Sequence, residues 1–124
     1  MTDKVADTSA IAAILFLEPG YEAVKDALSD CTLFAPALIR FELANVCLKK
    51  IRARSDERDA LLQAFASFKD FGVHEIDVDF AETIRLAEAM KLSLYDASYL
   101  WLAGKMEIQL VTLDKRLGEA ASAI

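Results

Sequence analysis

The stretch Lys4-Val5-Ala6-Asp7-Thr8-Ser9, followed by the apolar run from Ala10 to Leu17, decides the fold of this 124-residue chain. A short strand that ends in a capping residue and continues into a buried helix explains this order, because Asp is among the preferred N-cap residues. Pro19-Gly20 breaks the helix. The opening of the chain therefore predicts a strand followed by a helix.

The same alternation continues along the chain. Further strands are expected at 32–34, 73–76 and 108–112, and helices at 21–29, 37–54, 55–71, 79–91 and 93–103, with a last helix from Asp114. Strands that alternate with helices imply a parallel sheet covered on both faces. With no internal repeat, low-complexity tract or linker, one α/β domain is expected to span residues 1–124.

Hydropathy and the N-terminus bear on where the protein works. The longest apolar run, Ala10 to Leu17, is far shorter than the roughly 20 residues that a membrane-spanning helix needs. The first residues, from Met1 to Lys4, lack the features of a signal peptide. A cytoplasmic protein with no membrane segment is therefore expected.

Cysteine and histidine usage excludes several kinds of site. Cys31 and Cys47 have no neighbouring metal-type ligands, which argues against structural zinc. His74 is the only histidine, so most histidine-based catalysis is excluded, including a Ser-His-Asp triad unless His74 itself serves. We interpret His74, within a predicted strand, as structural.

Three aspartates are candidates for chemistry, but each also has a structural explanation. Asp7 and Asp114 both follow a predicted strand and precede a helix, which is the position of an N-cap. Asp96 lies three residues after Ser93, the spacing of a capping box.

Glu42 is predicted to lie in the middle of an apolar helix, where capping does not explain it. Burial of an unpartnered carboxylate costs several kcal/mol, so such a residue is paired, protonated or bound to a metal. Arg40, two residues away, points elsewhere on the helix. A cation from a distant part of the chain is therefore one open alternative as the partner of Glu42. Asn45, at i+3, lies on the same face and is a candidate hydrogen-bond donor.

Together the four acids suggest more than each does alone. Ligands of open parallel sheets bind beyond the carboxyl ends of strands, which is where Asp7 and Asp114 stand, and the helix opened by Asp96 is expected to face the same edge. Crowded acids raise one another's pKa values unless a cation is present. Clusters rich in oxygen and free of histidine suit Mg²⁺ or Mn²⁺.

Four segments, in this order and at this spacing, resemble the PIN-domain nucleases, and within them the VapC-type toxins of bacterial type II toxin–antitoxin systems. The matching segments are Val5-Ala6-Asp7-Thr8-Ser9-Ala10, Phe41-Glu42-Leu43-Ala44-Asn45, Leu92-Ser93-Leu94-Tyr95-Asp96-Ala97-Ser98-Tyr99-Leu100 and Leu110-Val111-Thr112-Leu113-Asp114-Lys115-Arg116-Leu117. Each segment alone is a weak signal, but the four together cover nearly the whole chain.

The resemblance implies a three-layer α/β/α sandwich with a short parallel sheet, in a protein that is usually dimeric. It also implies an endoribonuclease that hydrolyses RNA phosphodiester bonds with Mg²⁺ or Mn²⁺, and a cognate antitoxin that blocks the site.

Carried over to this sequence, Asp7 and Asp96 resemble the principal metal ligands, and Glu42 and Asp114 the other two acids. The residues that would orient ligands or the scissile phosphate are Thr8, Ser9 and Thr112. A fifth acid of some relatives is missing, because Lys115-Arg116-Leu117 follows Asp114. The number of bound ions, one or two, therefore stays open.

The net charge of −6 counts against RNA binding by the surface as a whole. One local group of cations is Lys49, Lys50, Arg52, Arg54 and Arg58. We interpret it as a solvated helix end, where cations suit the helix dipole. Lys115 and Arg116, beside Asp114, are better placed to touch substrate.

Two rival functions remain. A receiver-like signalling module also places acids and Mg²⁺ at strand ends, although it normally has an acidic pair after its first strand, where this chain has Asp7 alone. A PIN-like domain that is catalytically silent and serves as an interaction scaffold is the other. A phosphatase of the haloacid-dehalogenase type is disfavoured because Ser9 stands where its second aspartate is needed.

The aromatic residues Tyr95, Tyr99 and Trp101 are expected in the core or, failing that, on a dimer face.

Overall fold

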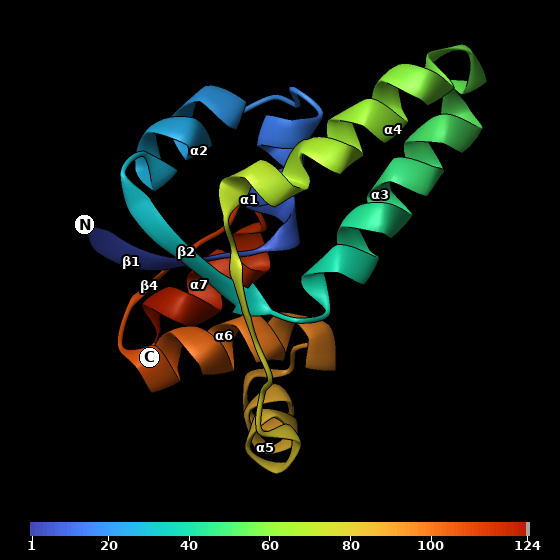
Figure 1. Cartoon of the computed structure of the whole chain (residues 1–124). Helices are drawn as coiled ribbons and strands as arrows, with labels where there is room; N and C mark the ends of the chain where they lie inside the picture. The colour runs from blue at the N-terminus through green and yellow to red at the C-terminus, as the bar shows by residue number, and fades with distance from the viewer. Residues whose placement is uncertain (124) are drawn as a thin grey trace.

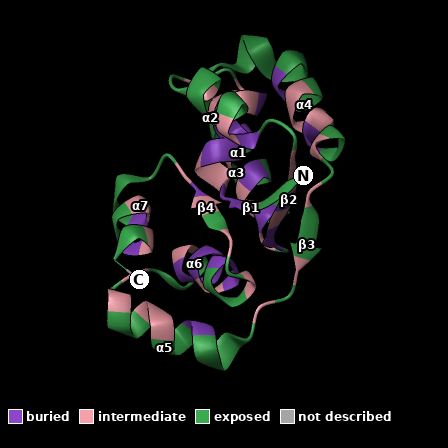
Figure 2. Cartoon of the chain, turned by 90° about the vertical axis from the view of Figure 1, so that its left-hand side faces the viewer, coloured by how far each residue is buried: buried purple, intermediate pink, exposed green. Residues whose placement is uncertain are grey.

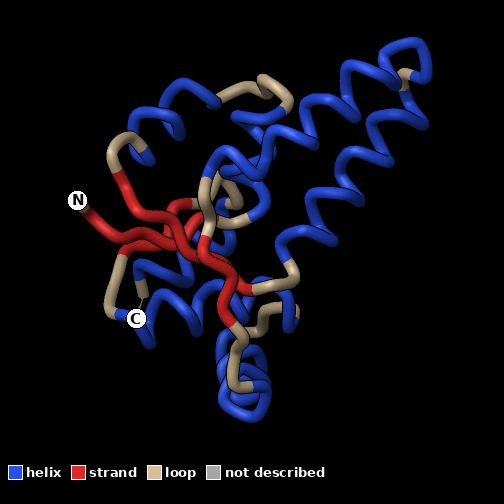
Figure 3. The backbone as a smooth tube through the Cα atoms, in the orientation of Figure 1, coloured by secondary structure: helices blue, strands red, loops and turns tan. Residues whose placement is uncertain are grey.

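The fold, in a computed structural model that describes residues 1–123, is built on a four-stranded sheet (Figures 1 and 3). The strands are β1 (Thr2–Ala6), β2 (Cys31–Pro36), β3 (His74–Ile76) and β4 (Gln109–Val111). Their order across the sheet is β3-β2-β1-β4, and every neighbouring pair is parallel. The predicted parallel α/β architecture is therefore confirmed.

Helices connect these strands, and one more follows the last strand. Within residues 1–123 they are α1 (Thr8–Leu15), α2 (Tyr21–Leu28), α3 (Ile39–Ala53), α4 (Arg58–Ala66), α5 (Phe80–Met90), α6 (Leu94–Met106) and α7 (Lys115–Ser122), with 3-10 turns η1 (Ser55–Glu57) and η2 (Ser67–Phe71). In Figures 1 and 2, α1 and α2 cover one side of the sheet and α6 covers the other, with α5 outside α6. Helices α3 and α4 form a hairpin that projects from the body (Figure 1). These layers are those of an α/β/α sandwich.

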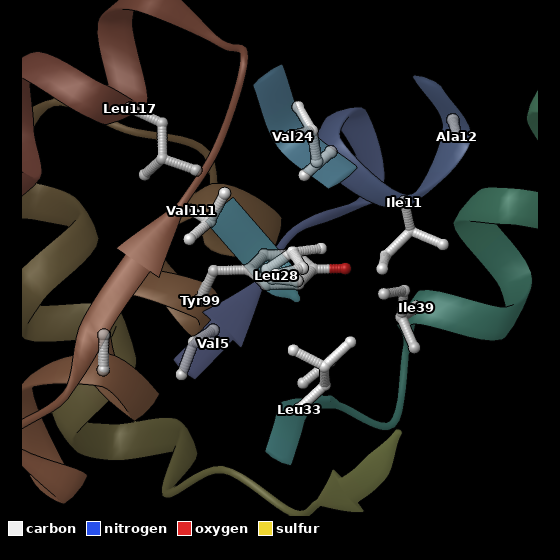
Figure 4. Packing of buried hydrophobic residues seen from close by; sticks show 14 of the residues in the cluster. Val5, Ile11, Ala12, Val24, Leu28, Leu33, Ile39, Tyr99, Val111 and Leu117 are labelled. Carbon is white, nitrogen blue, oxygen red and sulfur yellow. The ribbon is translucent and has the colours of Figure 1, made fainter. Parts of the chain in front are cut away.

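The core lies between the two central strands and the helices α1 and α6. Val5 of β1, Ile11 of α1 and Tyr99 of α6 are all at most 1% exposed. Figure 4 shows Tyr99 in the middle of this cluster, between Val5 and Ile39 of α3. Because α6 packs directly on β1 and β2, a residue on its inner face is fixed relative to the sheet.

The strand order reverses between β1 and β4. From β1 the chain moves outward to β2 and then to β3, and it afterwards returns to the far side of β1 to form β4. A crevice for ligands is expected at the carboxyl ends of the two strands that flank such a reversal. Asp7 directly follows β1, and Asp114 lies shortly after β4.

Several predicted boundaries need correction. The long helix begins at Ile39, so Glu42 lies in its first turn and not in the middle, and only one face of α3 is buried. Phe41, beside it, is 84% exposed. The single helix expected over 55–71 is divided: Ser55 begins the 3-10 turn η1, α4 follows it, and the 3-10 turn η2 ends the segment. The sequence analysis did not reveal that a turn at Ala37 and Leu38 separates β2 from α3.

No helix among residues 1–123 is long and apolar enough to cross a membrane.

Candidate functional site

Asp7 is the most enclosed acid of the candidate site. Its side chain caps α1, with Oδ1 accepting hydrogen bonds from the Ala10 N–H at 3.0 Å and from Ser9 Oγ at 2.7 Å. Oδ2 accepts from Thr112 Oγ1 at 2.5 Å. Asp7 is only 5% exposed. The predicted capping role is confirmed, but the cap uses only one of three bonds, so capping does not account for the whole environment.

Thr112 connects Asp7 to the end of β4. Its Oγ1 also accepts from the Asp114 N–H at 2.9 Å, and Ser9 Oγ accepts from the Leu113 N–H at 2.9 Å. Asp114 itself caps α7, because its Oδ1 accepts from the Leu117 N–H at 2.9 Å. We call Asp7, Ser9, Thr112 and Asp114 the strand side of the site.

Glu42 is held by two hydroxyl groups. Its Oε1 accepts from Thr8 Oγ1 at 2.8 Å and from the Tyr99 hydroxyl at 2.6 Å, and these two hydroxyls are 3.0 Å apart. The alternative of a distant cation is wrong for this carboxylate, since its bonding partners among residues 1–123 are hydroxyls. No hydrogen bond joins it to Asn45 in that range, so that expectation is not met.

Asp96 opens α6 and completes the set. Its main-chain N–H donates to Ser93 Oγ at 3.1 Å, which confirms Ser93 as the N-cap. Asp96 is half-buried. We call Thr8, Glu42, Asp96 and Tyr99 the helix side of the site, because all four belong to α1, α3 or α6.

Tyr99 is the residue of this site for which the sequence analysis expected a place in the core or on a dimer face and no role among the acids. It is 1% exposed, as a core residue should be, yet its hydroxyl bonds Glu42. Its pKa is raised, first by burial and then by the charge of Glu42, so the hydroxyl stays protonated and donates. Its spacing from Asp96, three residues on the same helix, was a signal that the two share a face.

The pKa values of three of the acids show that the cluster is crowded with negative charge. Burial raises the pKa of Asp7 and Asp114 adds to this effect, while bonds from Thr112, Ser9 and Ala10 oppose it. Burial also raises the pKa of Glu42, helped by Asp96 and Asp7 and opposed by the Tyr99 and Thr8 bonds. The charges of the four acids therefore interact, as the positions of these residues in the sequence predict.

The pKa of Asp96 is raised in the same way, with one difference. Burial is again the largest cause, followed by the charge of Asp114, but the Arg116 guanidinium and the Ser93 hydroxyl lower the pKa. Arg116 also donates from Nη2 to the carbonyl of Lys91. Arg116 is thus tied beside Asp96, whereas Lys115 is exposed at the start of α7.

The donor atoms of the candidate site could hold a hard divalent cation. They belong to carboxylates and hydroxyls, whose oxygens suit Mg²⁺ or Mn²⁺ better than zinc or copper. Across residues 1–123, however, no three His, Cys, Asp or Glu side chains already converge on one metal position. The chemistry of the residues fits a cation, and binding one requires the carboxylates to draw together.

A cleft opens beside Glu42 at the base of the α3–α4 hairpin. It has a volume of ≈ 550 Å³ and is lined by Leu38, Phe41, Glu42, Asn45 and Tyr95. Tyr95 is 62% exposed, so the expectation of a core position is wrong for it. Trp101 is half-buried and donates from Nε1 to Glu82 Oε1 at 2.9 Å.

Other residues singled out in the sequence have structural surroundings. Lys50 of the basic group pairs with Glu18 at 2.8 Å, and Arg54 pairs with Glu57 at 3.5 Å. These pairs favour the interpretation as a helix end. The ring of His74 stacks on Phe34 with centroids 5.1 Å apart, which agrees with a structural role for this histidine.

Comparison with known proteins agrees with this fold. The chain is 34% identical to "Ribonuclease VapC3" of Pyrobaculum aerophilum over 125 aligned residues, which cover 97% of this chain and 95% of the relative. Its structure is similar to the crystal structure of PAE2754 from Pyrobaculum aerophilum, with a TM-score of 0.68 and 26% identity over 96% of this chain and 86% of the other. Residues 4–123 match the PIN domain. The chain therefore belongs to the PIN-domain family.

Proposed function

We propose that the protein is an endoribonuclease that requires Mg²⁺ or Mn²⁺ and acts as the toxin of a toxin–antitoxin pair. The observation that carries the proposal is the gathering of four acids from separate elements at the reversal of strand order, with the pKa values of three raised. The likeness to a VapC ribonuclease along almost the whole chain supports RNA as substrate.

In this proposal Asp7 and Asp96 are the principal metal ligands, and Glu42 and Asp114 bind the ion directly or through water. An ion held there would supply Lewis-acid chemistry, polarising a phosphate oxygen and lowering the pKa of a water. The chain contributes by fixing the orientation of its ligands. Ser9 and Thr112 do so for Asp7, and Thr8 does so for Glu42.

Binding of RNA to an acidic protein requires cations near the site. Lys115 directly follows Asp114 and is exposed, and Arg116 lies beside Asp96. We assign contacts with the substrate phosphates to these two residues, because a local positive group holds a phosphate although the net charge is −6. Cleavage with a Lys115→Ala variant should then show a raised KM and a weaker dependence on salt.

The wider proposal is that residues 1–124 form one PIN domain that works in the cytoplasm as a homodimer under the control of an antitoxin. Large exposed apolar side chains support a partner surface, among them Phe41, Leu48, Phe80 and Ile84. Sedimentation measurements on the purified chain, with and without the product of a neighbouring antitoxin gene, test both partners.

The test of activity uses chain purified free of antitoxin, incubated with structured and unstructured RNAs in Mg²⁺, Mn²⁺ or EDTA. We expect internal cleavage that EDTA, Asp7→Asn and Asp96→Asn each abolish. The matched control is Asp70→Asn, which changes an exposed aspartate of η2 far along the chain from the four acids. Cleavage that survives both Asp7→Asn and Asp96→Asn would come from a contaminant and would contradict the assignment of the protein as a ribonuclease.

The same preparation decides between the proposal and its rivals. A catalytically silent scaffold would bind the antitoxin and leave every RNA intact with either metal. A receiver-like module would carry an acid-labile phosphoryl group on Asp7 after treatment with acetyl phosphate. Membership of the PIN-domain family favours the nuclease over the receiver.

A further inference from the structure

The hydroxyl of Tyr99 stands where core packing alone does not require one. The ring is enclosed by the cluster shown in Figure 4, and its oxygen points toward the side of the core where Ile11 and Ile39 lie. A phenylalanine would fill the same apolar volume. Burial of a hydroxyl without a partner is unfavourable, and this one is satisfied by Glu42 and Thr8.

Both hydroxyls bond the same oxygen of Glu42. Thr8 and Tyr99 reach Oε1, and no donor among residues 1–123 contacts Oε2. These two bonds, from α1 and α6, restrain the orientation of the Glu42 carboxylate. Its second oxygen keeps its lone pairs and is held in one direction.

The helix that carries Tyr99 also carries Asp96, three residues earlier. Residues at this spacing lie on one face of a helix. Helix α6 therefore supplies one acid of the cluster and, through Tyr99, restrains an acid that belongs to α3. Thr8, adjacent to Asp7, ties the same carboxylate to α1.

We propose that Tyr99 is a positioning residue, whose hydroxyl acts together with that of Thr8 to clamp Oε1 of Glu42 and leave Oε2 free to bind a divalent cation. The inference rests on the metal site of the proposed function. It adds a residue that acts on the ion through Glu42 and does not itself touch the ion or the RNA.

The test measures Mn²⁺ binding by calorimetry in the absence of RNA, on the full chain. Tyr99→Phe removes the hydroxyl and keeps the ring, and we expect Mn²⁺ affinity to fall by about 10–100-fold, the usual effect of losing a group that orients a metal ligand. With RNA and saturating Mn²⁺, kcat should fall more than KM rises. Tyr21→Phe, the same chemical change at the start of α2, is the control and should bind Mn²⁺ as the wild type does.

A purely structural role for the hydroxyl is separated by a double-mutant cycle. In a Glu42→Gln background, Tyr99→Phe should cause no further loss of Mn²⁺ affinity, because the group that Tyr99 orients is no longer a ligand of the same kind. An unchanged affinity in the single variant, or an equal loss in both backgrounds, overturns the proposal. If Tyr99→Phe does not fold, Thr8→Val is put through the same cycle, since it removes the other hydroxyl on Oε1.

Failure of this inference and failure of the proposed function give different results. In one outcome the wild-type chain binds Mn²⁺, Tyr99→Phe weakens that binding as described, and no RNA is cleaved. This outcome supports the role of Tyr99 and contradicts the ribonuclease. Wild-type chain that cleaves RNA while Tyr99→Phe binds Mn²⁺ normally removes the clamp alone.

Discussion

The strand side and the helix side of the site hold their carboxylates by different means. On the strand side the acids follow two adjacent parallel strands, and Asp7 has both oxygens bonded. On the helix side Glu42 has one oxygen clamped by hydroxyls from two other helices. The first arrangement comes from the pairing of β1 with β4 and from helix caps, whereas the second depends on how α1, α3 and α6 pack. The strand side is therefore positioned by main-chain pairing and helix caps, and the helix side by the packing of three helices.

The largest effect on RNA cleavage is expected for Asp7, and it should exceed that of the other aspartate of the strand side, Asp114. Asp7→Asn places an amide in a buried position bonded by Ser9 and Thr112, and we expect cleavage of RNA to fall by about 100-fold or more, the equivalent of roughly 3 kcal/mol in transition-state stabilisation. Asp114→Asn retains a good cap for α7 at an exposed position, so its cleavage of RNA should fall less than that of Asp7→Asn. Rates under single-turnover conditions with Mn²⁺ measure both. Equal losses of cleavage rate in the two variants would mean that the burial of an acid does not determine how much it contributes to cleavage.

Thr112 is the next residue by expected effect, because it alone connects the two acids of the strand side. Thr112→Val keeps the shape of the side chain and removes both its donation to Asp7 and its acceptance from the Asp114 N–H. Cleavage should fall by about 10–100-fold. Thr2→Val, at the opposite end of β1, is the control. A variant as active as the wild type would show that the cap of α1 alone orients Asp7.

A smaller effect concerns pH and the helix side. The pKa of Asp96 is raised in the folded protein, so this group favours folding below its ordinary pKa of 3.8, and that contribution is lost as the pH rises through the higher folded value. In EDTA, the free energy of unfolding of Asp96→Asn minus that of the wild type should therefore increase as the pH rises from 4 to 7 on urea denaturation.

Saturating Mg²⁺ should reverse this order at pH 7, since the ion stabilises only the protein that retains its ligand. Asp70→Asn should show neither the pH trend nor the reversal. A difference between Asp96→Asn and wild type that falls with rising pH would contradict the assigned direction.

Asn45 should give the smallest effect. It shares a face of α3 with Glu42 but is exposed, and no bond joins the two side chains. Asn45→Ala should therefore change cleavage by no more than about twofold, which corresponds to the ±0.5 kcal/mol typical of surface substitutions. A tenfold loss would show that the helix side extends into the adjacent cleft.

The same contrast explains how much could be predicted from the sequence. Asp7 and Asp114 carry local signals, a strand before and a helix after, and their places followed from these signals. Glu42 was singled out on the premise that it lies in the middle of a helix, but α3 starts later and one of its faces is open. Its partners belong to elements 34 and 57 residues away, and no local pattern encodes such contacts. Tyr99 was expected in the core, but its bond to Glu42 was missed, because a buried tyrosine with such a bond looks the same in sequence as one without it.

The bond between Thr112 and Asp7 spans 105 residues, almost the entire chain. The site is therefore incomplete until late in synthesis: a chain on which β4 has not yet been made possesses Asp7 and Glu42 but neither Thr112 nor Asp114. Contacts between distant parts of a chain also form slowly in folding, because closing the long loop is unfavourable. In the ribonuclease proposed above, this topology postpones full assembly of the site until the residues up to Asp114 have been made.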